Sequence, residues 1–192
     1  MNNVLRPALV LFALLTAVTG VVYPALVTSI AQVAFADEAR GSLVRSGDTV
    51  VGSSLVGQNF SDPKNFWGRP SATGPMPYNG AVSSGSNQGP TNPALLDAVK
   101  ARIEALRAAD PGNTLAVPVD LVTASASGLD PHISVAAALY QAPRVARLRG
   151  LPPERVQALI DAHTEHRLLG FLGEERVNVL ALNRALAGSA SR

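Results

Sequence analysis

A run of 30 residues near the start of the chain, from Pro7 to Ala36, contains no Asp, Glu, Lys, Arg or His. Leu, Val, Ala, Phe and Ile make up most of it. An α-helix rises about 1.5 Å per residue, so about 20 apolar residues cross the hydrocarbon core of a bilayer. The run is long enough to cross a membrane, and the rest of the chain then lies on one side. The sequence therefore predicts a transmembrane helix in the region 7–36.

A cleaved signal peptide is the alternative interpretation of this run. Ala34-Phe35-Ala36 has the A-x-A pattern of a cleavage site directly before Asp37. However, the apolar part of a signal peptide has about 7–15 residues, and its leading region is more basic than one that offers only Arg6. These features favour a retained anchor.

Two local features of the run bear on how the helix packs. Pro24 is tolerated in a membrane helix and predicts a kink there. Thr16, Thr19 and Gly20 form a patch of small residues. This patch either fills the helix surface or lets another membrane helix approach closely.

Charges beside the run indicate the orientation. Arg6 and the amino terminus precede it, and Arg40 and Arg45 follow it. A very short, positively charged N-terminal tail usually stays in the cytoplasm. We therefore expect a cytoplasmic tail at 1–6 and an extracytoplasmic domain at 37–192, in a single-pass protein of the inner (plasma) membrane. The absence of cysteine is compatible with an oxidising compartment.

The composition of the chain limits the classes of partner. Residues 37–192 are enough for one domain with its own core. The net charge of +2 lacks the strongly basic character that nucleic-acid binding requires. Only 16% of residues are charged, while the chain has 14 Pro and 16 Gly. This composition suggests a surface that a partner partly covers.

Periodicity and turn residues predict a mixed α/β fold for this domain. A hairpin is expected around Ser46-Gly47-Asp48, and a strand at 117–123. Helix starts are indicated at Asn92-Pro93, at Ser134 and at Pro152-Pro153. A strand leading into a helix is expected within 177–186.

The helix that begins after Ser134 has two further features. Pro143 predicts an interruption or the start of a new turn. Arg144, Arg147 and Arg149 are expected to form a solvated basic side, or else a contact for an acidic partner.

Two polar loops are the candidate binding segments. The loop 61–92 is rich in Pro, Gly, Ser and Asn, and it also holds Trp67 (the only tryptophan) and Arg69. Its aromatic residues can attach it to the body of the domain, so it is either a packed surface loop or a binding loop. The loop 123–134 is the second polar segment.

The sequence does not favour phosphate binding, metal binding or nucleophilic catalysis. The only lysines, Lys64 and Lys100, are not followed by Ser or Thr, so no phosphate-binding P-loop is present. His163 and His166 have i, i+3 spacing rather than the i, i+4 spacing of a helical zinc site, so no metal site is expected.

The residue types of a catalytic triad, Ser127, Asp130 and His132, stand too close in sequence to form one easily. Turn and capping hydrogen bonds explain such a loop better. A membrane-anchored periplasmic hydrolase that uses Ser127 or His132 remains the alternative function.

A set of motifs in order along nearly the whole chain carries a family resemblance. These motifs are LRPAL at 5–9, TGVVYP at 19–24, GSSLVGQNF at 52–60, WGRPSA at 67–72, PYN at 77–79, DLVTASASGLDPHIS at 120–134 and RVNVLALN at 176–183. Together they resemble the C subunit of the bacterial potassium-transporting P-type ATPase, the Kdp complex.

The resemblance implies a non-catalytic accessory subunit of an ATP-driven, high-affinity K⁺ uptake complex. Its partners would be the lipid bilayer, a channel-like subunit that selects K⁺, the P-type subunit that hydrolyses ATP, and a small accessory peptide. The subunit would support assembly and stability, and would act as a catalytic chaperone that raises the ATP affinity of the pump subunit. It would hold no cofactor firmly, because the partners handle ATP and K⁺.

The resemblance also suggests Gln58, within SLVGQ, as a nucleotide contact. A domain outside the membrane cannot touch cytoplasmic ATP, so we expect any effect on ATP affinity to be coupled through the membrane helix. Partner contacts are expected in the two polar loops, over the extracellular K⁺ entrance. The candidate residues are Trp67, Arg69, Tyr78, Asn79, Gly85, Asn87, Ser127 and Asp130.

Overall fold

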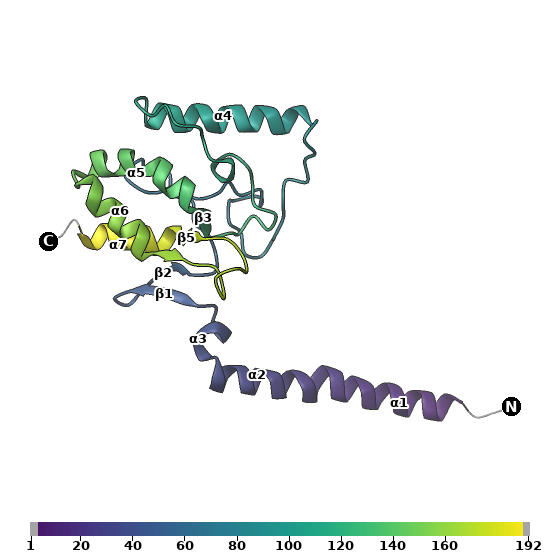
Figure 1. Cartoon of the computed structure of the whole chain (residues 1–192). Helices are drawn as coiled ribbons and strands as arrows, with labels where there is room; N and C mark the ends of the chain where they lie inside the picture. Colours follow the sequence, from purple (N-terminus) through teal and green to yellow (C-terminus); the bar gives the residue numbers. More distant parts are fainter. Residues whose placement is uncertain (1–3, 190–192) are drawn as a thin grey trace. The chain divides into compact units, whose positions relative to one another are not determined.

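The computed structural model describes residues 4–189, so parts of the predicted tail 1–6 and of the predicted domain 37–192 lie outside the described residues. One helix dominates the first 51 residues (Figure 1). It consists of α1 (Leu5–Ala17), a π-helical turn η1 (Val18–Val22) and α2 (Tyr23–Ala34). Leu5–Ala34 is 30 residues long, and it is long and apolar enough to span a membrane.

The π turn ends two residues before Pro24 and accommodates this proline. Proline has no N–H to donate, and its ring crowds the carbonyl four residues earlier in a regular helix. Here the N–H of Tyr23 donates to the carbonyl of Val18, five residues back. The irregularity at Pro24 is therefore a widened turn, after which the helix continues to Ala34.

A short helix, α3 (Ala36–Ala39), follows, and then the predicted hairpin is confirmed. Its strands are β1 (Leu43–Ser46) and β2 (Thr49–Ser53). Gly47 takes the positive φ of +59° that the turn requires. The chain divides into two compact units at this point, the first ending at Val51 and the second beginning at Gly52.

The second unit is a mixed α/β domain with a small antiparallel sheet in the order β3-β5-β4. Its elements are α4 (Pro93–Ala109), η2 (Val119–Leu121), β3 (His132–Ser134), α5 (Val135–Arg149), α6 (Pro153–Ala162), β4 (Thr164–Glu165), β5 (Arg176–Asn178) and α7 (Val179–Ser189). Ile133 pairs with Val177 at the centre of the sheet. Both are buried in one core with Val145 of α5, Ile160 of α6 and Leu182 of α7.

The predicted helix starts are confirmed. The side chain of Asn92 accepts the N–H of Ala94 at 3.0 Å, with Pro93 as the first helical residue. The hydroxyl of Ser134 accepts the N–H of Ala137 at 3.0 Å and caps α5. Pro143 does not interrupt α5, which runs through it to Arg149.

The predicted strand at 117–123 is wrong, because this segment forms the 3₁₀ turn η2. Side chains, rather than a neighbouring strand, engage its polar groups. Arg102 donates to the carbonyl of Val122 at 2.7 Å. The carboxylate of Asp120 accepts the N–H of Ser134 at 2.7 Å, which ties the turn to the start of α5. An apolar run with Pro at its second position supports a turn equally well.

Candidate functional site

Two side-chain amides hold the aromatic part of the loop 61–92. Asn183 of α7 accepts the N–H of Phe66 at 2.8 Å and donates to its carbonyl at 2.9 Å. Gln141 of α5 does the same for the next residue, Trp67, at 2.8 and 3.1 Å. The two amides thus replace the hydrogen bonds that a neighbouring strand would supply. The loop is a packed element, and the side chain of Phe66 is fully buried.

Arg144 reinforces this attachment from α5. Its side chain is only 1% exposed, and its guanidinium lies 4.7 Å from the centre of the Trp67 ring. It donates to Gln141 Oε1 at 2.7 Å and to the carbonyl of Pro63. Burial lowers the pKa of Arg144 to about 10, still well above neutral pH. The positive charge of Arg144 therefore contacts the loop rather than solvent.

The other two arginines of α5 also have partners within the domain. Arg149 donates to the carbonyl of Lys64 at 2.7 Å and to Asn65 Oδ1 at 2.6 Å. Arg147 is half-exposed and pairs with Asp110 at 2.8 Å. The prediction of a solvated basic side is therefore wrong for Arg144. The carbonyls of Pro63 and Lys64 lie in a loop and have no helical hydrogen-bond partner. They accept hydrogen bonds from Arg144 and Arg149 instead.

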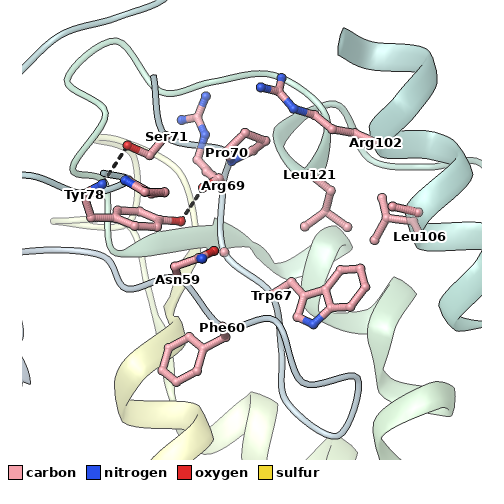
Figure 2. Close-up of a pocket in the computed structure, with 13 residues that line it drawn as sticks. Asn59, Phe60, Trp67, Arg69, Pro70, Ser71, Tyr78, Arg102, Leu106 and Leu121 are labelled. Atoms are coloured by element: carbon pink, nitrogen blue, oxygen red, sulfur yellow. Dashed lines mark hydrogen bonds between the residues drawn. The ribbon is translucent and has the colours of Figure 1, made fainter. Parts of the chain in front are cut away.

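A pocket of about 290 Å³ opens beside the held loop, and Figure 2 shows its lining. The loop supplies Trp67, Arg69 and Tyr78, which are three of the predicted contact residues. The opposite wall comes from α4 and η2, through Arg102, Ala105, Leu106 and Leu121. The remaining lining residues are Asn59, Phe60, Gly68, Pro70, Ser71 and Pro77.

Tyr78 is fixed as one wall of this pocket. It has a positive φ of +56°, and its N–H donates to Ser71 Oγ at 2.9 Å. Its hydroxyl donates to the carbonyl of Arg69 (Figure 2). Burial, together with the nearby charge of Asp130, raises the pKa of Tyr78 to about 12. The phenol therefore stays neutral and keeps its donor role at physiological pH.

An ion pair links the two polar loops. Arg69 of the first lies 3.1 Å from Asp130 of the second. The backbone N–H of His132 donates to Asp130 Oδ1 at 3.0 Å. Burial alone would raise the pKa of Asp130, but the hydrogen bonds from His132 and Arg69 outweigh it and hold the pKa at about 2. Asp130 is thus ionised throughout the neutral range.

Close backbone packing joins the same two loops. The N–H of Ser84 donates to the carbonyl of Ser127 at 3.0 Å. A Cβ at Gly85 would lie 2.8 Å from the carbonyl oxygen of Ala126, and one at Gly128 only 2.6 Å from that of Ser84. Both distances are too short for a side chain, so glycine is required for this approach.

The other predicted contact residues have different positions. Asn79 donates through its backbone N–H to Thr73 Oγ1 at 3.0 Å and through its side chain to the carbonyl of Gly74 at 3.2 Å. Asn87 is exposed, with a φ of +51°. The side chain of Ser127 accepts the N–H of Leu129 at 3.1 Å. Asn79 and Ser127 therefore shape the loops, and contact with a partner stays a prediction for the whole set.

Gln58 lies half-buried beside Gly52 in the second unit. A Cβ at Gly52 would overlap the side-chain amide of Gln58, so the two are closely packed. The role of Gln58 as a nucleotide contact stays a prediction. In the long apolar helix Leu5–Ala34, Thr19 Oγ1 donates to the carbonyl of Leu15 at 2.7 Å, and Thr16 and Gly20 lie on the exposed helix surface. Their role in helix packing also stays a prediction.

The geometry around His132 gives no support to the hydrolase alternative. Its Nδ1 lies 3.5 Å from Asp130 and its Nε2 lies 3.4 Å from Glu165. Both ring nitrogens face carboxylates, so neither is placed to take a proton from Ser127. The hydroxyl of Ser127 instead accepts the N–H of Leu129 within the same loop. The Ser and Asp residues of this loop thus make the turn and capping hydrogen bonds that were expected.

The remaining histidines make separate contacts. Nδ1 of His163 is 2.8 Å from the carbonyl of Leu159, and Nδ1 of His166 is 2.7 Å from Glu175. Across residues 4–189, no group of three or more His, Cys, Asp or Glu side chains is arranged to hold a metal ion.

The sequence patterns did not identify the helix residues that hold the loop and line the pocket. Gln141 and Asn183 were overlooked as loop holders, and Arg102 as part of the pocket wall. The available signal was the position of two amides among the apolar residues of helices. A buried amide needs partners for both its donor and its acceptor. Which backbone supplies them depends on the tertiary structure.

The comparisons with known proteins agree with one another. The family described as "KdpC: K+-transporting ATPase, c chain" matches residues 5–188. A Variovorax paradoxus protein is 72% identical over 191 residues, which are 100% of this chain and 99% of that protein. A Polaromonas naphthalenivorans protein is 69% identical over 186 residues, covering 97% and 95% of the two chains. Both relatives carry the name "Potassium-transporting ATPase KdpC subunit".

Proposed function

Because this chain belongs to the KdpC family, the c chains of K⁺-transporting ATPases, we propose that it is the non-catalytic accessory subunit of an ATP-driven, high-affinity K⁺ uptake complex. Its membrane helix anchors it in the inner membrane, and the domain that begins after the helix lies on the periplasmic side. Its partners are a channel-like subunit that selects K⁺, a P-type subunit that hydrolyses ATP, and a small accessory peptide. It supports the assembly and stability of this complex.

The observation that carries this proposal is the held aromatic loop with its pocket. Trp67, Arg69 and Tyr78 are residue types that are enriched among interface hot spots. Here the amides of Gln141 and Asn183 fix the adjoining loop backbone before any partner arrives. Preorganisation of this kind strengthens binding, because less conformational freedom is lost on association. The pocket therefore suits a loop or side chain of a partner subunit at the extracellular K⁺ entrance.

The effect on ATP affinity is proposed to be indirect. A periplasmic domain and a cytoplasmic nucleotide lie on opposite sides of the membrane, so their coupling has to pass through states shared with the partner subunits. The helix surface with Thr16, Thr19 and Gly20 is the proposed route. A direct nucleotide contact by Gln58 is the competing proposal. Replacing Gln58 with Ala raises the KM for ATP of the complex only under the direct proposal.

The pocket is best tested from its exposed rim. Ala105 lies on the exposed side of α4 and lines the pocket. Ala105→Phe fills the opening without removing an internal hydrogen bond, and Ala108→Phe is the matched control on the same helix. The tagged chain is purified in mild detergent from cells that express the partner subunits. We expect Ala105→Phe, but not Ala108→Phe, to reduce co-eluting partners and K⁺-stimulated ATPase activity.

Two results would contradict the proposal in different ways. If Ala105→Phe and Ala108→Phe retain the partner subunits equally well, the pocket is not part of the interface. If the unaltered chain elutes alone while the other subunits keep full K⁺-stimulated activity, the accessory role itself fails. Charge reversal at Arg69 and bulky substitution at Gly85 are poorer tests, because they break the pair with Asp130 and the packing on Ala126.

A further inference from the structure

The turn between β4 and β5 carries four large apolar side chains into solvent. Leu168, Leu169, Phe171 and Leu172 are 69%, 76%, 70% and 48% exposed. We call residues 168–172 the apolar tip. A contiguous exposed group of Leu and Phe in a folded domain usually marks a surface that contacts a membrane or another protein.

The backbone of the apolar tip is held by its own hydrogen bonds. Leu168 and Leu172 exchange two N–H···O bonds of 2.9 Å each, and the N–H of Phe171 donates to the carbonyl of Leu168 at 3.3 Å. Gly170 takes a φ of +80° and Leu169 a φ of +55°. The left-handed conformation is unfavourable for leucine, because its Cβ then crowds the following carbonyl oxygen. The tip is therefore a closed turn that keeps apolar side chains outward at a cost, which indicates function.

Charged residues border the apolar tip on both sides. His166 Nδ1 lies 2.7 Å from Glu175 and Arg176 Nε lies 2.9 Å from Glu165, so two polar side-chain contacts close the base of the turn. Arg167 directly precedes the tip, and Glu174 follows it after Gly173. The change from apolar to charged thus occurs within one residue at one end and two at the other. A segment that enters the boundary between lipid headgroups and acyl chains has this profile.

We propose that the apolar tip inserts into the surface of the lipid bilayer on the side of the membrane where the domain lies. This inference rests on the proposed membrane anchor. Residues 35–51 separate the membrane helix from the second unit, and even fully extended they reach no more than about 60 Å. The domain is thus kept close to lipid, and this raises the effective concentration of the tip at the membrane surface.

Two physical arguments favour lipid over a protein partner. A specific protein interface uses about 20–30 residues and about 800 Å² from each partner, which four side chains cannot supply. In contrast, a few apolar side chains suffice for a tethered domain, because transfer of each one from water into an apolar environment is favourable. The internal hydrogen bonds of the tip also remove most of the penalty of taking a backbone out of water.

The test uses the absence of native cysteine in the chain. The full chain carrying Phe171→Cys is labelled with a nitroxide and reconstituted in phosphatidylcholine vesicles. Collisions with oxygen, which concentrates in lipid, are compared with collisions with a nickel chelate, which stays in water. Leu115→Cys, at another exposed leucine, is the matched control. We expect oxygen access to exceed nickel access at position 171 and the reverse at position 115.

A second variant separates insertion from folding. Asparagine tolerates the positive φ of Leu169, so Leu169→Asn should keep or raise the thermal unfolding midpoint while it weakens insertion of the Phe171→Cys label. If nickel access at 171 equals that at 115, the tip stays in water and the inference is overturned. It is also overturned if the label in the assembled complex is closed to both reagents, because a protein subunit then covers it. The measurement on the chain reconstituted alone does not require the complex to assemble, so a failure of the tip to insert is distinguishable from a failure of the proposed function.

Discussion

Asn183 offers the sharpest test of how the aromatic loop is held. Its side chain makes two hydrogen bonds with the backbone of Phe66, at 2.8 and 2.9 Å, and it joins residues 117 positions apart. Asn183 is 5% exposed and Phe66 is fully buried, so water does not readily replace a lost partner. Asn183→Ala therefore leaves a buried N–H and a buried carbonyl without their partner.

The size of the effect follows from those two groups. Leaving a buried backbone polar group unsatisfied costs about 1–3 kcal/mol, so two groups together cost about 2–6 kcal/mol. A domain has a free energy of unfolding of about 5–15 kcal/mol, so this is a large fraction of it. In a domain of this size, 1 kcal/mol lowers the unfolding midpoint by roughly 2–4 °C. We expect a fall in Tm of roughly 4–24 °C.

Trp67 reports on the loop directly, because it is the only tryptophan and lies next to Phe66. The full chain in detergent is unfolded while Trp67 fluorescence and helical circular dichroism are both followed. Gln157→Ala is the control, since it removes an exposed amide from a helix. Asn183→Ala should lower both midpoints and shift the Trp67 emission to longer wavelength.

If Asn183→Ala and Gln157→Ala instead unfold at the same midpoint with unchanged Trp67 emission, the two hydrogen bonds do not hold the loop. The reasoning for Gln141, which rests on the same geometry, would then fail with it.

Three further predictions concern charge and close packing. The pKa of Asp130 is lower in the folded state than in the unfolded state, so ionised Asp130 stabilises the fold by about 2 kcal/mol above pH 4, and this stabilisation is lost as the pH falls towards 2. Asp130→Asn should flatten this part of the pH–stability curve. An unchanged curve would contradict the ion-pair geometry. Gly128→Ala, at a φ of +68° and 2.6 Å from a carbonyl oxygen, should lower the free energy of unfolding by more than 1 kcal/mol, whereas Gly112→Ala, in open space, should change it little in a urea titration. Arg144→Met should shift Trp67 emission and destabilise the domain by about 1–3 kcal/mol, because it leaves the carbonyl of Pro63 without its donor, while Arg147→Met, at a half-exposed position, should have less than half that effect. Equal effects would place the two arginines in the same environment.

Local sequence patterns predicted several elements correctly. The membrane-length helix follows from 30 uncharged residues, the hairpin from Gly47, and the starts of α4 and α5 from Asn92 and Ser134. Each depends on composition or on bonds between residues a few positions apart, so no distant contact is needed. The strand predicted at 117–123 was wrong because long-range hydrogen bonds from Arg102 and to Asp120 chose a turn there.

The sequence by itself determined the long apolar helix, the presence of a mixed α/β domain, the two polar loops and, through ordered motifs, the family. Only the tertiary structure decided how the two loops contact each other and the helices α5 and α7. Arg144 looked like part of a solvated side, yet it is buried against Trp67; Gln141 and Asn183 looked like ordinary helix residues, yet they hold the loop. The physical reason is that a buried polar group must find a partner, and packing brings that partner from a distant part of the chain.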